Sequence, residues 1–168
     1  FVMRGIGSYG VGAAVVSSIV TSINGHSVNT SVMTDLGFID LERIEILNGP
    51  QGTLFGRNSV QGVINLITKR PTEELGGYVD VEVGSFNRQF VKGAINVPFS
   101  DSLRTRLAFA TNTRDGMVEN GYTGNAMDDR NDQSIRLSVD WDIDDTTELK
   151  FTYSGQKSDD NRPQEEAS

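Results

Sequence analysis

The residues of this sequence that could do chemistry begin with a glycine motif close to its first residue. Gly5, Gly7 and Gly10 stand in a G-x-G-x-x-G spacing. That motif binds dinucleotide phosphates when a helix follows it and an acidic residue stands about 20 positions further on. Residues 15–23 are instead rich in β-branched side chains, which favour a strand, and residues 25–34 contain no acidic residue. The pattern therefore predicts a glycine-rich loop between two strands and not a dinucleotide site.

Candidate metal and catalytic residues are also scarce. The single histidine, His26, follows a turn and has no carboxylate or second histidine near it. The acidic run at residues 128–132 lacks the glycine and the terminal glutamate of a calcium loop. The absence of cysteine excludes disulfides, thiolate metal sites and cysteine nucleophiles. We therefore predict that the protein is not an enzyme and has no catalytic site, metal or cofactor.

The charge of the chain is unevenly distributed. Residues 1–70 hold five Lys/Arg and four Asp/Glu, whereas residues 71–168 hold ten and nineteen. The net charge of −8 argues against a nucleic-acid partner, whose phosphates need a basic surface. The change in charge at Pro71 suggests a domain boundary there. No run of about 18 apolar residues exists, so no transmembrane helix is expected, while barrel strands, with their weaker hydropathy, stay possible.

The second part of the chain alternates between apolar and polar residues. The alternation predicts five strands of about 8–11 residues, long enough to cross a bilayer when tilted. One face of these strands is apolar throughout, and the other carries full charges. The five runs are residues 79–83, 91–97, 103–110, 135–143 and 149–154. The charged positions are Asp80, Glu82, Arg104, Arg106, Arg136, Asp140 and Asp142.

The connections between these strands favour a barrel over a sandwich, because a sandwich alternates in the same way. Residues 98–102 and 144–147 are tight turns, and residues 115–132 form a long polar loop. The short connection at residues 85–87 is the one exception. Short turns at one end and long loops at the other are typical of outer-membrane barrels.

The first part of the chain centres on a run of tight corners. A short charged turn is expected at residues 40–43, a strand at 44–47 and a second apolar strand at 62–69. Asn24-Gly25 is a further strong turn signal, because both residues tolerate positive φ. The corners between the two strands allow the chain to turn repeatedly in little space, and their residues are Gly49, Pro50, Gly52 and Gly56.

These motifs together resemble the TonB-dependent receptors of the Gram-negative outer membrane. The similarity is strongest in the string LERIEILNGPQGTLFGRN at residues 41–58. It includes Arg4-Gly5, Ile23-Asn24-Gly25 and the string GVINLITKRP at residues 62–71. The resemblance covers the whole chain.

The resemblance implies a fold in two parts. Residues 1–70 are expected to be the C-terminal part of a mixed α/β plug domain. Residues 71–168 are expected to be the first five strands of an antiparallel transmembrane β-barrel, a fragment of a 22-stranded barrel with a plugged lumen. The plug's beginning, with its TonB box, is expected to lie outside this fragment.

The resemblance also implies a function. The protein is expected to be an outer-membrane receptor that imports a scarce ligand such as a siderophore–iron complex, haem, cobalamin or an oligosaccharide. Its expected partners are that small-molecule ligand, outer-membrane lipid, and TonB with its inner-membrane energising complex, which rearranges the plug. The residues alone leave open a soluble all-β binding or adhesion module.

The expected site residues fall into two sets. Arg4 and Phe55 are candidates for contact with the ligand, as in the family. A plug must be held by polar contacts that can be released, and an unpaired buried charge would be costly. The plug candidates for these contacts are Glu42, Arg43, Glu45 and Arg57, and those of the barrel include Arg104 and Arg106.

Two positions depart from the family's pattern. Asn48 stands where the family usually has an arginine before Gly-Pro, which puts one contact between plug and barrel in doubt. Gln61 stands where a second glycine is common.

Overall fold

The structure is a computed structural model of the chain, and it describes residues 2–3, 6–7, 19–28, 39–49, 62–119 and 126–159. The chain divides into two compact units, Phe1–Lys69 and Arg70–Ser168. Within the described ranges every regular element is a strand. The helices of a mixed α/β plug are therefore not found in this part of the chain. No helix there is long and apolar enough to cross a membrane.

The first unit contains a four-stranded sheet in the order β4-β3-β6-β5. Strands β3 and β6 run parallel, while the β3–β4 and β5–β6 pairs are antiparallel. A separate antiparallel pair, β1 with β2, precedes it. The strands are β1 (Val2–Met3), β2 (Ile6–Gly7), β3 (Ile19–Ile23), β4 (His26–Val28), β5 (Leu41–Asn48) and β6 (Gly62–Thr68).

Local backbone geometry explains the turns of this unit. Asn24 has φ 50° and Gly25 has φ 83°, the positive pair that a two-residue hairpin turn requires, so the turn predicted there is confirmed. The charged turn expected at residues 40–43 is shorter than predicted. Asp40 (φ 51°) is the turn residue, and the strand already begins at Leu41, which pairs with Thr68.

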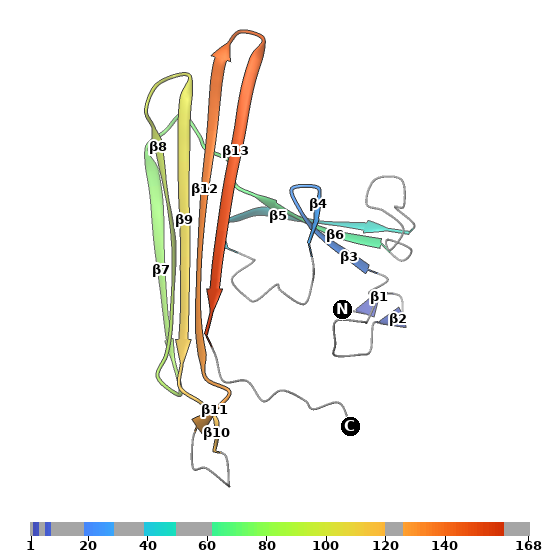
Figure 1. Cartoon of the computed structure of the whole chain (residues 1–168), viewed down its shortest axis with the longest axis vertical. Coiled ribbons are helices and arrows are strands. Elements are labelled where there is room, and N and C mark those ends of the chain that lie inside the picture. Colours follow the sequence, from blue (N-terminus) through green and yellow to red (C-terminus); the bar gives the residue numbers. More distant parts are fainter. Residues whose placement is uncertain are drawn as a thin grey trace. The chain divides into compact units, whose positions relative to one another are not determined.

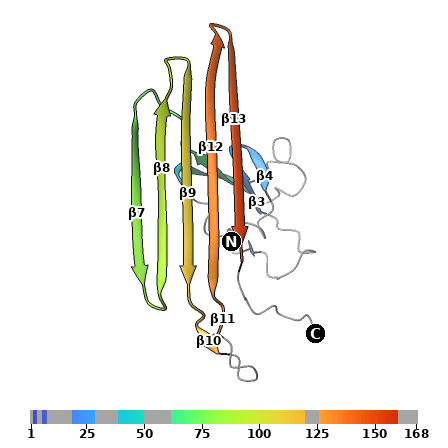
Figure 2. The same ribbon diagram turned by 60° about the vertical axis from the view of Figure 1, so that its left-hand side comes forward.

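The second unit is built around five long antiparallel strands in the order β13-β12-β9-β8-β7, which run side by side in Figure 2. All five predicted strands are present, and each extends beyond its alternating run. They are β7 (Gly76–Gly84), β8 (Arg88–Pro98), β9 (Leu103–Arg114), β12 (Arg130–Asp144) and β13 (Thr147–Ser158). At 15 residues, β12 exceeds the expected length.

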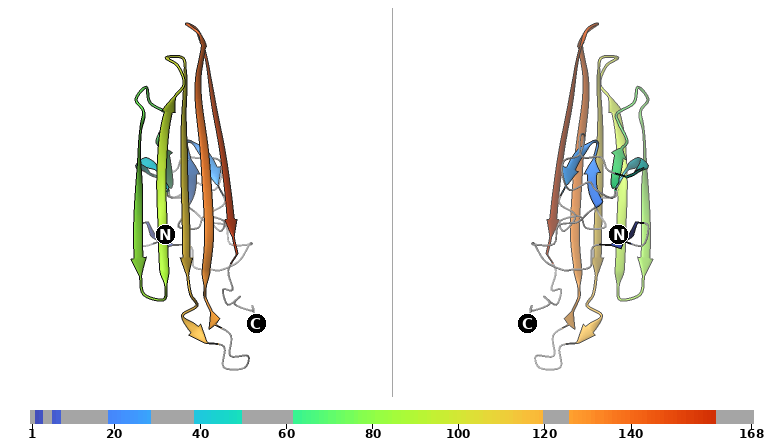
Figure 3. Two further views of the ribbon diagram at one scale, coloured as in Figure 1. Left: turned by 90° about the vertical axis from the view of Figure 1, so that its left-hand side faces the viewer. Right: turned by 90° about the vertical axis from the view of Figure 1, so that its right-hand side faces the viewer.

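The two ends of this sheet differ. The turns from β8 to β9 and from β12 to β13 are short and lie at one end (Figure 1). The connection from β9 to β12 lies at the other end and carries the small strands β10 (Val118–Glu119) and β11 (Ala126–Met127) (Figure 3). The short turn from β7 to β8 shares that second end.

One face of the five-stranded sheet is apolar and exposed. The register aligns Ile95 with Leu107, Leu107 with Leu137, and Leu137 with Tyr153, so these side chains form one row across four strands. Their exposed fractions are 47% for Ile95, 37% for Leu107, 36% for Leu137 and 57% for Tyr153. Soluble monomers rarely expose a contiguous apolar surface of this extent.

The other face of the sheet is polar, and several of its side chains are buried. Asn96, Arg136, Ser138 and Asp140 are at most 6% exposed, and the buried apolar residues beside them are alanines, among them Ala108. This distribution is the reverse of an ordinary sandwich strand, whose large apolar side chains are the buried ones.

Replacing Gly93 by alanine tests the close packing within this sheet. A Cβ at Gly93 would lie 2.7 Å from the carbonyl oxygen of Tyr78 and 3.0 Å from two ring carbons of Phe109. We expect Gly93→Ala to destabilise the sheet by about 1–3 kcal/mol. The measurement is the temperature at which the complete protein loses its compact mobility in SDS gels. Gly76→Ala, with no atom within 4 Å of its Cβ, is the matched control, and equal midpoints for the two variants would contradict the packing.

Candidate functional site

The first unit holds a network of hydrogen-bonded polar groups centred on the buried side chain of Asn65. The Asn65 carbonyl oxygen accepts hydrogen bonds from the Ser22 hydroxyl at 2.8 Å and from the Gly25 backbone N–H at 3.0 Å. Its amide group donates to a carboxylate oxygen of Glu45 at 3.0 Å. Asn65 is 7% exposed and Ser22 is fully buried. One side chain on β6 therefore ties together β3, the β3–β4 turn and β5.

The same turn is fixed to β6 a second time by Asn24. Its carbonyl oxygen accepts from the Thr68 backbone N–H at 3.0 Å, and its amide donates to the Thr68 hydroxyl at 3.0 Å. The Asn24 backbone N–H donates to the Leu66 carbonyl at 3.0 Å. The turn is therefore bound to β6 through both the backbone and the side chain of Asn24.

The charged side chains of β5 are paired within the first unit. Arg43 lies 2.6 Å from Glu42 and 2.9 Å from Glu45. The hydrogen bond from Asn65, followed by that from Arg43, holds the pKa of the Glu45 carboxyl below its ordinary value. Glu45 is therefore ionised at neutral pH and anchors both partners. Their expected role as contacts to a barrel wall stays a proposal.

The polar face of the five-stranded sheet carries a set of cross-strand charges. The register aligns Arg104 on β9 with Asp140 on β12, and Arg106 with Ser138 on the same two strands. Arg104 lies 2.8 Å from Asp142 and 3.8 Å from Glu73, and it also donates to the Asp101 carbonyl at 3.3 Å. The alternating pattern predicted that these charged residues lie on one face of the sheet, and the register places them on one face.

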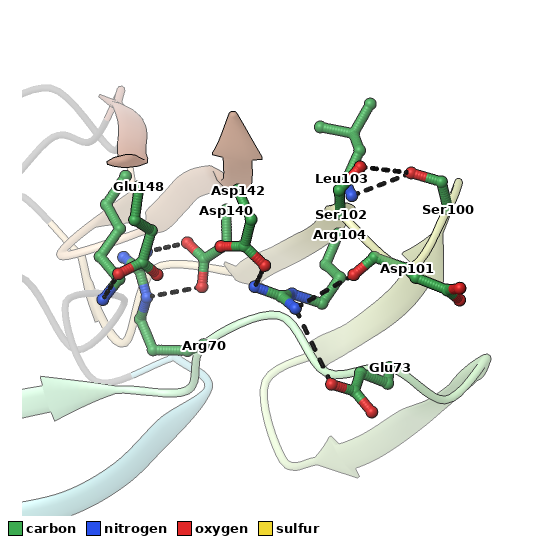
Figure 4. Close-up of polar contacts among 11 residues, drawn as sticks. Arg70, Glu73, Ser100, Asp101, Ser102, Leu103, Arg104, Asp140, Asp142 and Glu148 are labelled. Carbon is green, nitrogen blue, oxygen red and sulfur yellow. Dashed lines mark hydrogen bonds and ion pairs between the residues drawn. The ribbon is translucent and has the colours of Figure 1, made fainter. Parts of the chain in front are cut away.

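A second arginine reaches this face from outside the strands. Arg70, the first residue of the second unit, contacts both carboxylate oxygens of Asp140, with its Nε at 3.3 Å from Oδ2 (Figure 4). The Asp140 side chain is 7% exposed and that of Arg70 is 32% exposed. A bidentate, charge-assisted contact of this kind is stronger and more directional than a neutral hydrogen bond.

Asn96 on β8 binds the backbone of the same segment. Its carbonyl oxygen accepts from the Thr72 N–H at 2.9 Å. Its amide donates to the Thr72 carbonyl at 2.8 Å and to the Glu74 carbonyl at 2.6 Å. An open hollow of about 510 Å³ lies here, lined by residues 71–74, Arg104 and Asp140.

A further hollow lies at the end of the sheet that carries the long connection. Asn87, Thr113 and Arg130 are among its lining residues. Arg114, also in its lining, forms an ion pair with the Asp128 carboxylate at 2.7 Å. No group of three or more potential metal-ligating side chains was found among the described residues.

The structure describes only part of the predicted site. Gly49 has φ 89°, the left-handed geometry expected of a corner residue. Arg4, Pro50, Gly52, Phe55, Gly56 and Arg57 lie outside the described residues.

Sequence reasoning missed the roles of Arg70, Asn96 and Asn65. Arg70 and Asp140 are 70 positions apart, and no local pattern links them. Asn96 was visible only as a polar residue in an alternating run. An asparagine in the middle of the apolar stretch at residues 62–69 was the one available signal for Asn65.

Comparison with known proteins gives this arrangement a family context. Residues 1–63 match the TonB-dependent Receptor Plug Domain. The chain is 34% identical over 73 residues to the pesticin receptor of Yersinia pestis, covering 44% of this chain and 11% of that protein. It is 30% identical over 123 residues to the ferric-pyoverdine 358 receptor of Pseudomonas putida, covering 72% of this chain and 14% of the relative.

Solved structures show the same fold. The ferric yersiniabactin uptake receptor FyuA from Yersinia pestis matches with a TM-score of 0.75 and 25% identity, over 84% of this chain and 23% of that one. The pyoverdine outer-membrane receptor FpvA from Pseudomonas aeruginosa matches with a TM-score of 0.67 and 23% identity, over 84% and 21%. The chain thus spans only a minor part of the length of its relatives.

Removing the Asn65 side chain tests the hydrogen-bonded network of the first unit. Asn65→Ala leaves the Gly25 N–H and the Ser22 hydroxyl without their acceptor and Glu45 without one donor. We expect a loss of about 1–3 kcal/mol in the stability of this unit. The measurement is chemical denaturation of the complete protein, followed by a fluorophore in the first unit. Asn131→Ala, at an exposed position of β12, should change stability by less than about 0.5 kcal/mol. Equal effects of the two substitutions would contradict the role of Asn65.

Proposed function

We propose, for a chain that is part of a TonB-dependent receptor, that the complete protein is an active importer of the Gram-negative outer membrane. The observation that supports the proposal is the five-stranded sheet that follows residues 1–63, the part of the chain that matches the plug domain. Its large apolar side chains are exposed on one face, and its charges lie on the other.

The two faces suit two different solvents. Lipid tails offer no hydrogen bonds, so a strand in the bilayer needs a fully paired backbone and apolar side chains toward the lipid. The continuous hydrogen bonding between the five strands pairs the backbone within the sheet. The exposed row through Leu107 and Leu137 supplies the apolar side chains that would face the lipid. The charged face suits a hydrated lumen. We take residues 71–168 as the first five strands of a 22-stranded barrel whose lumen the plug, ending near residue 70, closes.

The names of the relatives favour one class of ligand. They include receptors for ferric pyoverdine and ferric yersiniabactin and one for metal-pseudopaline. A siderophore–metal complex is therefore the ligand that we propose first, ahead of haem, cobalamin and oligosaccharides. Arg4 and Phe55 are proposed as ligand contacts of the plug.

The proposed mechanism requires a plug that can be held and released. Charged contacts suit this task because water can replace them when they separate, whereas an apolar interface would resist separation. Glu42, Arg43, Glu45 and Arg57 are the proposed contacts on the plug, and Arg104 and Arg106 are those on the barrel wall. TonB, driven by its inner-membrane complex, would pull on the plug and open a path for the ligand, without chemistry on the ligand itself.

The proposal predicts that binding and uptake separate when the energy source is removed. Cells that express the complete protein as their sole receptor of this kind are given a panel of ⁵⁵Fe-loaded siderophores. We expect one of them to be bound and taken up. Deletion of TonB, or a protonophore, should reduce uptake to the level of receptor-free cells while surface binding remains.

Receptor-free cells and cells with an unrelated TonB-dependent receptor serve as controls. Uptake that continues unchanged without TonB would overturn active import. Recovery of the protein as a detergent-independent soluble monomer would overturn the membrane assignment.

A further inference from the structure

The segment at residues 70–74, here called the strap, lies across the polar face of the sheet. Arg70 is bound to Asp140 on β12, Glu73 lies near Arg104 on β9, and Thr72 and Glu74 are bound to Asn96 on β8. The strap therefore contacts three successive strands before the chain enters the fourth, β7, at Gly76. Figure 4 shows Arg70 and Arg104 projecting toward the carboxylates of β12.

The strap is long enough to cross the strands from β12 to β7, and it bends at Glu73 and Glu74. Three strand spacings from β12 to β7 amount to roughly 14 Å. The six Cα-to-Cα steps from Arg70 to Gly76 reach at most about 20 Å. Because Arg70 is the first attached residue, tension on the preceding chain acts first on the Arg70–Asp140 contact.

The strap contacts made by Arg70 and Asn96 differ from the exposed ion pairs of the sheet. Glu82 with Arg88 and Asp80 with Lys92 are at 3.8 Å, and each of these side chains is at least 34% exposed. Exposed pairs of this type contribute little. Asp140 and Asn96, in contrast, are 5% and 2% exposed, and Asn96 makes three hydrogen bonds to one short segment of backbone. The strap is thus held mainly by buried side chains on β8 and β12, while the Glu73–Arg104 pair, at 3.8 Å with Glu73 82% exposed, adds little.

We propose that the strap is a mechanical stop that ends force-driven unfolding of the first unit at Arg70 and protects β7. Without it, tension would act at Gly76 and separate β7 from β8 one hydrogen bond at a time, beginning at the Gly76–Asn96 pair. With it, the load falls first on the Arg70–Asp140 contact to β12 and then on the Asn96 hydrogen bonds to β8, before it can reach Gly76. This inference rests on the proposed function, in which TonB pulls on the plug.

Single-molecule pulling of the complete receptor in a lipid bilayer tests the stop. Force is applied through a handle before Phe1, without TonB, and the released chain length is measured. We expect the wild-type trace to end its low-force events with the chain free up to residue 70. Asp140→Asn combined with Asn96→Ala should add roughly 20 Å of chain, the length of residues 70–76, at the same force. Glu82→Gln removes the carboxylate of an exposed pair and should leave the wild-type trace unchanged.

A second pair of variants avoids any change within the strands. Arg70→Gln removes the charged contact with Asp140. Thr72→Pro removes the backbone N–H that donates a hydrogen bond to the Asn96 carbonyl oxygen. Both should lengthen the released chain in the same way. Identical traces for wild type and these strap variants would overturn the stop, as would a wild-type trace that passes residue 70 at the force that unfolds the first unit. The pulling result needs no transport, so a failed stop leaves active import intact, and failed TonB-dependent uptake leaves the stop intact.

Discussion

The second unit depends on one constraint: its backbone must be fully paired while its large side chains face outward. Antiparallel pairing from β7 to β13 satisfies the backbone of the inner strands. That pairing allows one face to carry exposed leucine, isoleucine and phenylalanine, and the other to carry charge. In water the exposed face would favour aggregation, whereas in hydrocarbon it costs nothing. The sheet is therefore built for a lipid environment, and the polar face is where specific contacts can form.

Polar contacts fix how particular segments are arranged in both units. Asn65 and Asn24 fix a turn in the first unit, and Asn96 and Asp140 fix the strap in the second. Each is an amide or carboxylate that binds groups distant in sequence. Such contacts need one geometry to be satisfied, so they define a single arrangement more sharply than apolar packing does. They can also be exchanged for water, as the proposed release of the plug requires.

The sequence predicted those features that rest on local patterns. Alternation at residues 79–83 and 135–143 predicted β7 and β12, and Asn24-Gly25 predicted its turn. The resemblance to TonB-dependent receptors came mainly from the string at residues 41–58. Sequence could not predict the parallel pairing of β3 with β6, because 38 residues lie between Ile23 and Gly62. Nor could it predict the Arg70–Asp140 contact, which arises only after four strands have assembled in register. Leu41 was assigned to a turn because charged neighbours obscured its pairing with Thr68.

The orientation of the sheet in lipid is the central claim and can be measured directly. Spin labels are attached to single cysteines in the complete receptor in bilayers, as Leu107→Cys and Leu137→Cys, with Ala108→Cys and Ser138→Cys as their neighbours on the opposite face. Collision rates with oxygen, which concentrates in lipid, and with a water-soluble nickel chelate are then compared. We expect high oxygen and low nickel accessibility at 107 and 137, and lower oxygen accessibility at 108 and 138. Oxygen accessibility that does not alternate between neighbours, or labels at 107 and 137 that are shielded from oxygen, would contradict this account.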